Sequence, residues 1–234
     1  MEDTGDFMKK VVCWDFDGTL VYSHHLWSSS VLEALKDTDL NTDVTFADIR
    51  KYMAYGFTWN TPNEDYSNMT NDKWWVFMNK HIYNSYLSLG VDEKIADIAT
   101  KKVHKIIKRI DNYNLYDDAK QTLNTLKNMG VVNVLLSNNY PDLNDILVQL
   151  DLVKYFDKIV ISAVEGYDKP RKELFEIAKS GYENAQFYMV GDNENADVVG
   201  GKNANMTTIL VHKGYSEKAD YCFDDLKSIT EIFS

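Results

Sequence analysis

The chain has 234 residues, 44% of them hydrophobic and 26% charged, and its 25 basic against 36 acidic side chains give a net charge of −11. This length fits one large domain or a core with a smaller insert, and the acidic balance argues against binding to nucleic acid or to an anionic membrane. No apolar run is long enough to span a membrane and Met1–Asp6 lacks the parts of a signal peptide, so we expect a cytoplasmic enzyme that holds anionic ligands by local positive charge.

The first predicted element is a buried strand in the stretch Val11–Leu20, where a short apolar run leads into two carboxylates and a Gly-Thr pair. Side chains alternate along a strand, so Asp15 and Asp17 should point to the same side and Phe16 to the other. Two like charges this close require a compensating cation, and Mg²⁺ suits carboxylate ligands. Taken alone, the string could also be a solvated turn.

From Tyr22 to Asn112 the pattern is helical, and we expect no strand there. This pattern predicts a helical subdomain inserted just after the first strand, with residues 22–112 in the insert and residues 1–21 and 113–234 in the core. The four predicted helices span residues 26–36, 45–52, 71–90 and 92–110.

Four of the five tryptophans lie in this predicted insert. We expect Trp74 and Trp75 to build the core of the insert, since a small helical bundle needs large side chains. For Tyr55, Phe57 and Trp59, two interpretations stay open: packing inside the insert, or a surface that closes over a ligand.

After Tyr113 the predicted helices and strands alternate. Short apolar strands that alternate with helices indicate an α/β fold, with a Rossmann-like parallel sheet whose chemistry lies at the carboxyl ends of its strands. The predicted helices are residues 119–129, 143–150, 171–179, 196–202 and 226–233, and the predicted strands are residues 131–136, 158–161, 187–190 and 207–211.

Polar side chains suited to phosphoryl transfer stand at the ends of four of these strands: Asp15 and Asp17, Ser137 and Asn138, Lys169, and Asp192 with Asp197. A carboxylate can act as the nucleophile, and a hydroxyl and an ammonium group can hold phosphate oxygens. Asp192 would complete a metal site, with Asp197 orienting a ligand or a water behind it. Taken alone, each of these groups of residues could be only a turn, a helix start or a helix cap.

The order of these residues resembles the haloacid dehalogenase-like (HAD) hydrolase superfamily, in its phosphatase branch and in the subfamily with a helical cap between the first two strands. The likeness covers essentially the whole chain. It is carried most specifically by Asp15-Phe16-Asp17-Gly18-Thr19-Leu20 and by Gly191-Asp192 with Asp197, and more weakly by Ser137 and by Lys169-Pro170.

The resemblance implies a role for each of these residues. Asp15 would be the nucleophile and a metal ligand, and Asp17 the general acid and base, with its backbone carbonyl on Mg²⁺. Lys169 would hold the phosphate, and Asp192 would bind the metal. Substrate contacts would come from Thr19, Ser137 and Asn138.

Two departures from the family pattern affect these implications. True haloacid dehalogenases need no metal and have no acid at the place of Asp17, so its presence indicates phosphate chemistry. The stretch Leu115–Asp118 stands where many relatives carry Pro-Gly, which leaves the position of the hinge open.

We therefore expect a Mg²⁺-dependent phosphatase that acts on a small phosphorylated metabolite through an aspartyl-phosphate. The alternatives are a phosphosugar mutase of the same superfamily and a non-catalytic binding protein that retains the fold. His24 and His25 either line the entrance of the site or are simply exposed. The substrate and the oligomeric state stay open.

Overall fold

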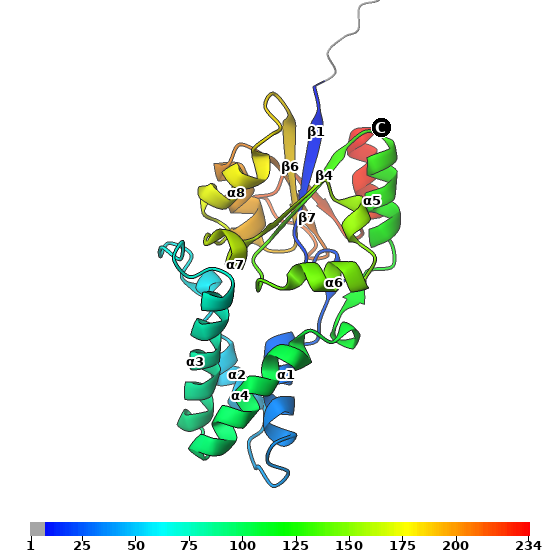
Figure 1. Ribbon diagram of the computed structural model, residues 1–234. Helices are drawn as coiled ribbons and strands as arrows, with labels where there is room; N and C mark the ends of the chain where they lie inside the picture. Colours follow the sequence, from blue (N-terminus) through cyan, green and yellow to red (C-terminus); the bar gives the residue numbers. More distant parts are fainter. Residues whose placement is uncertain (1–7) are drawn as a thin grey trace, which may run out of the picture.

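A computed structural model describes residues 8–234, and the expectation that concerned Met1–Asp6 lies outside them. The core is a six-stranded parallel sheet with the strand order β5-β4-β1-β6-β7-β8 (Figure 1). The strands are β1 (Lys10–Trp14), β4 (Val132–Ser137), β5 (Lys158–Ile161), β6 (Gln186–Gly191), β7 (Thr207–Val211) and β8 (Tyr221–Phe223).

Helices cover both faces of this sheet (Figure 1). Side chains alternate along β1, so Val12 and Trp14 pack on one face, while Val11 and Cys13 pack on the other. Burial on both faces explains why these strands are almost continuously apolar. The first face is covered by α5 (Ala119–Asn128), α6 (Leu143–Gln149) and a C-terminal 3₁₀ segment (Lys227–Phe233), and the second by α8 (Lys172–Lys179) and α9 (Gly200–Asn203).

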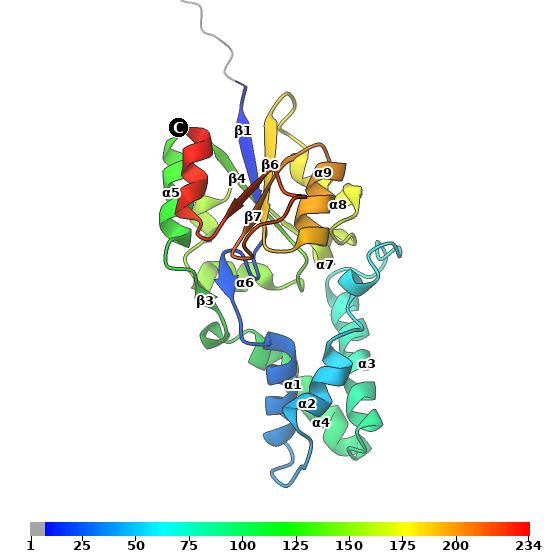
Figure 2. The ribbon, with the colours of Figure 1, turned by 180° about the vertical axis from the view of Figure 1, so that it is seen from behind.

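Four helices form a separate group beyond the end of the sheet at which the parallel strands finish (Figure 1). The chain enters this group through β2 (Val21–Tyr22) and returns through β3 (Asn114–Leu115), which pair antiparallel (Figure 2). We call residues 23–113 the helical insert. Its helices are α1 (Leu26–Lys36), α2 (Phe46–Met53), α3 (Asp72–Ser88) and α4 (Glu93–Ile107).

Two helices of the insert begin at side-chain caps. The Thr45 hydroxyl accepts from the Asp48 amide, and the Asp48 carboxylate accepts from the Thr45 amide, which satisfies two backbone donors at the start of α2. The Asp92 carboxylate accepts from the amides of Lys94 and Ile95 at the start of α4. These caps place both helix starts where the sequence predicts them.

The helical insert contacts the core on two sides. On one side, the Asp142 carboxylate before α6 accepts from the Trp75 indole at 2.6 Å and from the Lys108 ammonium at 3.2 Å. On the other, the loop before α3 lies on α7 (Ser162–Glu165), and the Asn71 amide donates to the Ala163 carbonyl at 2.9 Å. Together these contacts hold the insert over the carboxyl edge of the sheet.

The predicted fold class is confirmed, and several elements differ in detail. Tyr22 lies in β2, so the expectation of no strand from residue 22 onward is wrong at its first residue. The predicted helix 92–110 ends at Ile107, because the Asn112 side chain donates to the Ile106 carbonyl and draws the chain into a turn.

Other segments also depart from the predicted helices and strands. The region predicted as helix 196–202 begins earlier, as a π-helical turn (Glu194–Val199), because the Asn193 side chain caps the amides of Asn195 and Ala196. The last predicted helix is a 3₁₀ segment, and β8 and α7 were not predicted. The expected domain boundaries lie at β2 and β3 and remain a proposal. None of the helices described for residues 8–234 combines the length and apolar character that crossing a membrane requires.

Candidate active site

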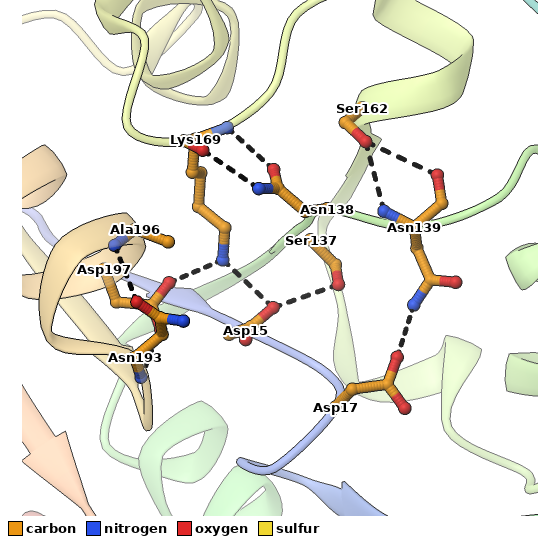
Figure 3. Close-up of polar contacts among 10 residues, drawn as sticks. All are labelled: Asp15, Asp17, Ser137, Asn138, Asn139, Ser162, Lys169, Asn193, Ala196 and Asp197. Atoms are coloured by element: carbon orange, nitrogen blue, oxygen red, sulfur yellow. Dashed lines mark hydrogen bonds and ion pairs between the residues drawn. The ribbon is translucent and has the colours of Figure 1, made fainter. Parts of the chain in front are cut away.

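The ends of three strands and the loop after α7, which supplies Lys169, bring the predicted site residues together (Figure 3). Ser137 is the last residue of β4, and Asp15 and Asp192 directly follow β1 and β6, which are neighbours of one another in the sheet, as β4 and β1 are. The Ser137 hydroxyl donates to Asp15 Oδ1 at 3.0 Å, and the Lys169 ammonium lies 3.0 Å from the same oxygen. One oxygen of Asp15 is therefore fixed by two donors.

Lys169 lies between two carboxylates. Its Nζ is 2.6 Å from Asp197 Oδ1 as well as 3.0 Å from Asp15, and its side chain is only 1% exposed. Burial opposes the charge, but Asp15 and Asp197 outweigh it and raise the pKa of Lys169 above its ordinary value. The ammonium group thus stays charged in the pH range in which the carboxylates are ionised.

Asn138 positions the backbone of Lys169. Its side-chain amide donates to the Lys169 carbonyl at 3.0 Å, and its Oδ1 accepts from the Lys169 amide at 2.7 Å (Figure 3). Asn138 also lines the hollows described below, so its expected substrate contact stays a prediction beside this observed role. Thr19 is fully buried, its Oγ1 has no hydrogen-bond partner among the described residues, and its expected substrate contact also stays a prediction.

The Asp17 carboxylate points away from Asp15 and toward Asn139 (Figure 3). Its Oδ2 accepts from the Asn139 side-chain amide at 2.7 Å, and its Oδ1 has no partner among the residues described. Burial and the charge of Asp15 raise the pKa of Asp17 to about 7. A carboxyl group with such a pKa can both give and take a proton near neutral pH.

Asn139 is a site residue that the sequence did not single out. Its backbone amide donates to the Ser162 hydroxyl at 3.1 Å, and its Oδ1 accepts from the Tyr140 amide at 3.0 Å. These bonds orient the amide nitrogen toward Asp17. The available signal was the second asparagine of the Ser137-Asn138-Asn139 string, but only the fold shows which of the two faces Asp17.

Asp15, Asp192 and Asp197 each place a carboxylate oxygen within 4.8 Å of the others, which is a spacing that could hold a metal ion. Both oxygens of Asp197 already accept hydrogen bonds, one from Lys169 and one from the Asn193 amide at 3.0 Å. Asp15 and Asp192 are therefore the carboxylates with ligand capacity to spare. The expected part of Asp17 in metal binding, through its carbonyl, stays a prediction.

The surroundings of Asp192 fit a small, hard cation. Gly18 has φ +81°, and a Cβ there would lie 2.2 Å from Asp192 Oδ2, so only glycine admits this carboxylate so close to the backbone. Burial and the charge of Asp15 raise the pKa of Asp192, although Lys213 lies 3.1 Å away. Asp15 and Asp192 lie close together and offer only carboxylate oxygens, which are ligands that Mg²⁺ prefers.

Two adjoining hollows open from these residues. The first, which we call the carboxylate hollow, has a volume of about 360 Å³ and is lined by Asp15, Asp17, Trp59, Asn138, Lys169 and Asp192, among others. The second, which we call the insert hollow, has a volume of about 380 Å³ and is lined by Asp17, His25, Trp27, Arg50, Trp59 and Asn138, among others. Because Asp17, Trp59 and Asn138 line both, the two hollows meet at the proposed acid.

The structure distinguishes Tyr55, Phe57 and Trp59, for which the sequence leaves open either packing inside the insert or a surface that faces a ligand. Phe57 is 5% exposed and packs inside the insert, with its ring 4.9 Å from Trp27 and stacked 4.6 Å from Trp59. Trp59 is half-buried and lines both hollows. Tyr55 is 70% exposed, and its ring lines neither hollow. The interpretation as a ligand-facing surface therefore suits Trp59 but not Phe57.

Comparisons with known proteins agree with this arrangement. A family model described as haloacid dehalogenase-like hydrolase matches residues 9–205. A glyceraldehyde 3-phosphate phosphatase from Pyrococcus furiosus is 29% identical over 125 residues, which are 49% of this chain and 52% of that protein. A phosphoserine phosphatase from Thermus thermophilus is 32% identical over 126 residues, which are 52% of this chain and 51% of that protein. The chain thus spans about half the length of these curated relatives.

The solved structures show the same fold. The crystal structure of the HAD-hydrolase YfnB from Bacillus subtilis, bound to magnesium, has a TM-score of 0.74 and 18% identity to this chain. The match covers 97% of this chain and 99% of that one. The likeness therefore includes the helical insert as well as the sheet.

Proposed function

The chain belongs to the haloacid dehalogenase-like hydrolase family, and from this premise and the geometry of the site we propose that it is a Mg²⁺-dependent phosphatase of a small phosphomonoester. One observation carries the proposal: Asp15 and Asp17 line the same hollow. Ser137 and Lys169 hold Asp15, and Asp17 Oδ1 has no partner among the described residues. The phosphatases named among the relatives support the same reaction.

In the first half of the proposed reaction, Asp15 is the nucleophile. Ser137 and Lys169 hold Oδ1, so Oδ2 is left to attack phosphorus as the bond between phosphorus and the ester oxygen breaks. Asp17, with a pKa of about 7, gives its proton to the leaving oxygen and releases an alcohol. The product on the protein is an aspartyl-phosphate.

In the second half, Asp17 acts as a base. Its carboxylate takes a proton from water, the water oxygen forms a bond to phosphorus, and the bond to Asp15 breaks, which releases inorganic phosphate. Lys169 holds phosphate oxygens in both halves, because it is a buried ammonium beside the nucleophile. A Mg²⁺ ion on Asp15 and Asp192 would neutralise the charge of the transferring phosphoryl group.

The helical insert would act as the cap of this site. Its residues Trp59 and Arg50 line the hollows, while the proposed chemical groups come from the sheet. An insert that covers a site in this way can exclude water and select the alcohol part of the substrate.

The proposal is tested by the release of phosphate from p-nitrophenyl phosphate and from a panel of phosphorylated metabolites, with and without Mg²⁺. We expect release to require Mg²⁺, and Asp192→Asn to raise the Mg²⁺ concentration for half-maximal rate by about tenfold or more, because one anionic ligand is lost. Equal Mg²⁺ dependence of this variant and the wild type would refute the metal assignment. Isomerisation of a phosphosugar without phosphate release would favour a mutase.

A further inference from the structure

The insert hollow lies where the alcohol part of a bound ester would extend. In the proposed reaction the phosphorus atom sits beside Asp15, and the ester oxygen faces Asp17. Asp17 lines both hollows, so the chain of atoms beyond the ester oxygen passes Asp17 and enters the insert hollow. A volume of about 380 Å³ leaves room for a small organic group there.

The lining of this hollow carries one permanent positive charge, and Arg50 supplies it. Asp17 is its only carboxylate, and it stands at the mouth shared with the carboxylate hollow. Leu26, Trp27 and Met53 add apolar surface to the same lining. The hollow therefore combines apolar surface with the guanidinium group of Arg50, which is an exposed residue of α2.

Arg50 differs from the other two arginines of the chain. Arg109 forms an ion pair with Glu33, and Arg171 lies 2.6 Å from Glu173. Within residues 8–234, no carboxylate lies within ion-pair distance of Arg50, whose guanidinium nitrogen instead lies 2.8 Å from His25 Nδ1. In a chain with a net charge of −11, an arginine without a carboxylate partner is available for an anion from outside.

We infer that Arg50 binds a second anionic group of the substrate in the insert hollow. This inference rests on the proposed phosphatase function and narrows its substrate class to phosphomonoesters whose alcohol part carries a carboxylate or a second phosphate. A carboxylate and a phosphate each present two oxygens that a guanidinium can bind through two parallel hydrogen bonds. Trp59 offers at most one face to a stacked nucleobase, because Phe57 covers the other, with an angle of 8° between the rings.

The test compares substrates that differ only in the second group. Ethyl phosphate is the neutral reference, phosphoglycolate adds a carboxylate, and 1,2-ethanediol bisphosphate adds a phosphate. We expect the wild type to prefer at least one of the two anionic esters in kcat/KM. Arg50→Gln should lower that preference by about 10- to 100-fold, since a charge-assisted pair is lost, and leave ethyl phosphate within about threefold.

A matched control removes the same charge next to the hollow. Lys51 follows Arg50 on α2 but pairs with Asp48 and does not line the hollow, so Lys51→Gln should keep the preference of the wild type. Arg50→Lys should fall between the wild type and Arg50→Gln, because an ammonium cannot form the parallel pair of bonds. An unchanged preference in Arg50→Gln, or an equal loss in Lys51→Gln, would overturn the inference.

A binding measurement separates this inference from the proposed function. If no ester is hydrolysed by the wild type, the proposed function is wrong, and calorimetric titration with phosphoglycolate, 1,2-ethanediol bisphosphate and ethyl phosphate still tests Arg50. Tighter binding of an anionic ester that is lost in Arg50→Gln and kept in Lys51→Gln supports the inference. Equal binding of all three esters by the wild type contradicts it. The ester that is favoured tells whether the second group is a carboxylate or a phosphate.

Discussion

The two hollows that meet at Asp17 hold their charged side chains in different ways. In the carboxylate hollow, Lys169 lies within 3.0 Å of Asp15 and Asp197, and Asp192 pairs at 3.1 Å with Lys213, which does not line the hollow. In the insert hollow, Arg50 has no carboxylate partner in the described part of the chain. The first set of charges is oriented by the protein itself, whereas the second leaves a cation for a ligand.

On the proposed function, this difference indicates that chemistry and substrate selection would be carried by separate parts of the molecule. Groups that act on phosphorus need fixed positions, because small misplacements cost much of the rate. A group that selects the alcohol part of the substrate needs only to be reachable and unpaired. Variants in the two hollows should therefore fail differently: the first set in rate for every substrate, the second in preference among substrates.

The largest effect is expected for Asp15→Asn. An amide is a poor nucleophile, so turnover should fall by more than about 10⁴-fold for every ester, and no phosphate should remain on the acid-quenched protein by intact mass. Asp97→Asn, the same change on an exposed residue of α4, is the control. Phosphate trapped on a residue other than Asp15 would rule out the proposed nucleophile.

Asp17→Asn should have the next largest effect, with alkyl esters losing about 10²–10⁴-fold in kcat. The loss should be smaller in the first step for p-nitrophenyl phosphate, because its leaving group departs without a proton. Phosphate should then accumulate on Asp15, since the base for the second step is missing, and acid quenching measures it. Equal losses for alkyl and nitrophenyl esters with no accumulation would contradict the acid and base role.

Phe57→Ala and Trp59→Ala compare two aromatic residues of the insert, one buried and one that lines both hollows. Phe57 is buried, so its truncation should cost about 3 kcal/mol in the free energy of unfolding, measured with urea, and affect all substrates alike. Trp59 lines both hollows, so its truncation should change the ranking of substrates more than stability. A folded Trp59→Ala protein with the ranking of the wild type would exclude this role.

The smallest effect is expected for Asp142→Asn, at the contact between insert and core. Burial disfavours the charge of Asp142, but hydrogen bonds from Trp75 and Lys108 outweigh it and hold its pKa below the ordinary value. A lowered pKa contributes stability that is full above the ordinary pKa of about 3.9 and is lost as pH falls below it. Because the pair is partly exposed, we expect a loss of about 0.5–1 kcal/mol at neutral pH.

The measurement is urea unfolding of the wild type and Asp142→Asn between about pH 7 and pH 3. The difference between the two proteins should be present at neutral pH and shrink as the wild-type carboxyl group is protonated. A difference that stays constant over this range would show that the charge of Asp142 does not contribute.

Much of the sheet and of the carboxylate hollow could be predicted because their signals are local. An apolar strand followed by a polar residue marks Asp15, Ser137 and Asp192, and parallel strands place such ends on one edge. The capping pair Thr45 and Asp48 likewise fixes the start of α2 within four residues of sequence. Local periodicity and topology together thus predict the chemical half of the site.

The rest depends on contacts between distant residues. Asn139 faces Asp17 only because Ser162, on another segment, accepts its backbone amide. Arg50 was not singled out from the sequence, because its place in the lining of a hollow and its lack of a carboxylate partner among residues 8–234 appear only once the chain is folded. The sequence leaves Phe57 open as a ligand-facing residue, because one of the rings that bury it, Trp27, comes from another segment of the insert.

The ribbon of β2 and β3 has a consequence for how such a protein can be varied. Val21 pairs with Leu115 and Tyr22 with Asn114, so the chain leaves the core and re-enters it at neighbouring points. Because the two ends of the insert are adjacent, a segment of another length can replace it without a change in the order of the strands. A short turn can also connect the two ends. On the proposed function, recombination at two sites in the gene would therefore change the substrate preference and leave the reaction the same.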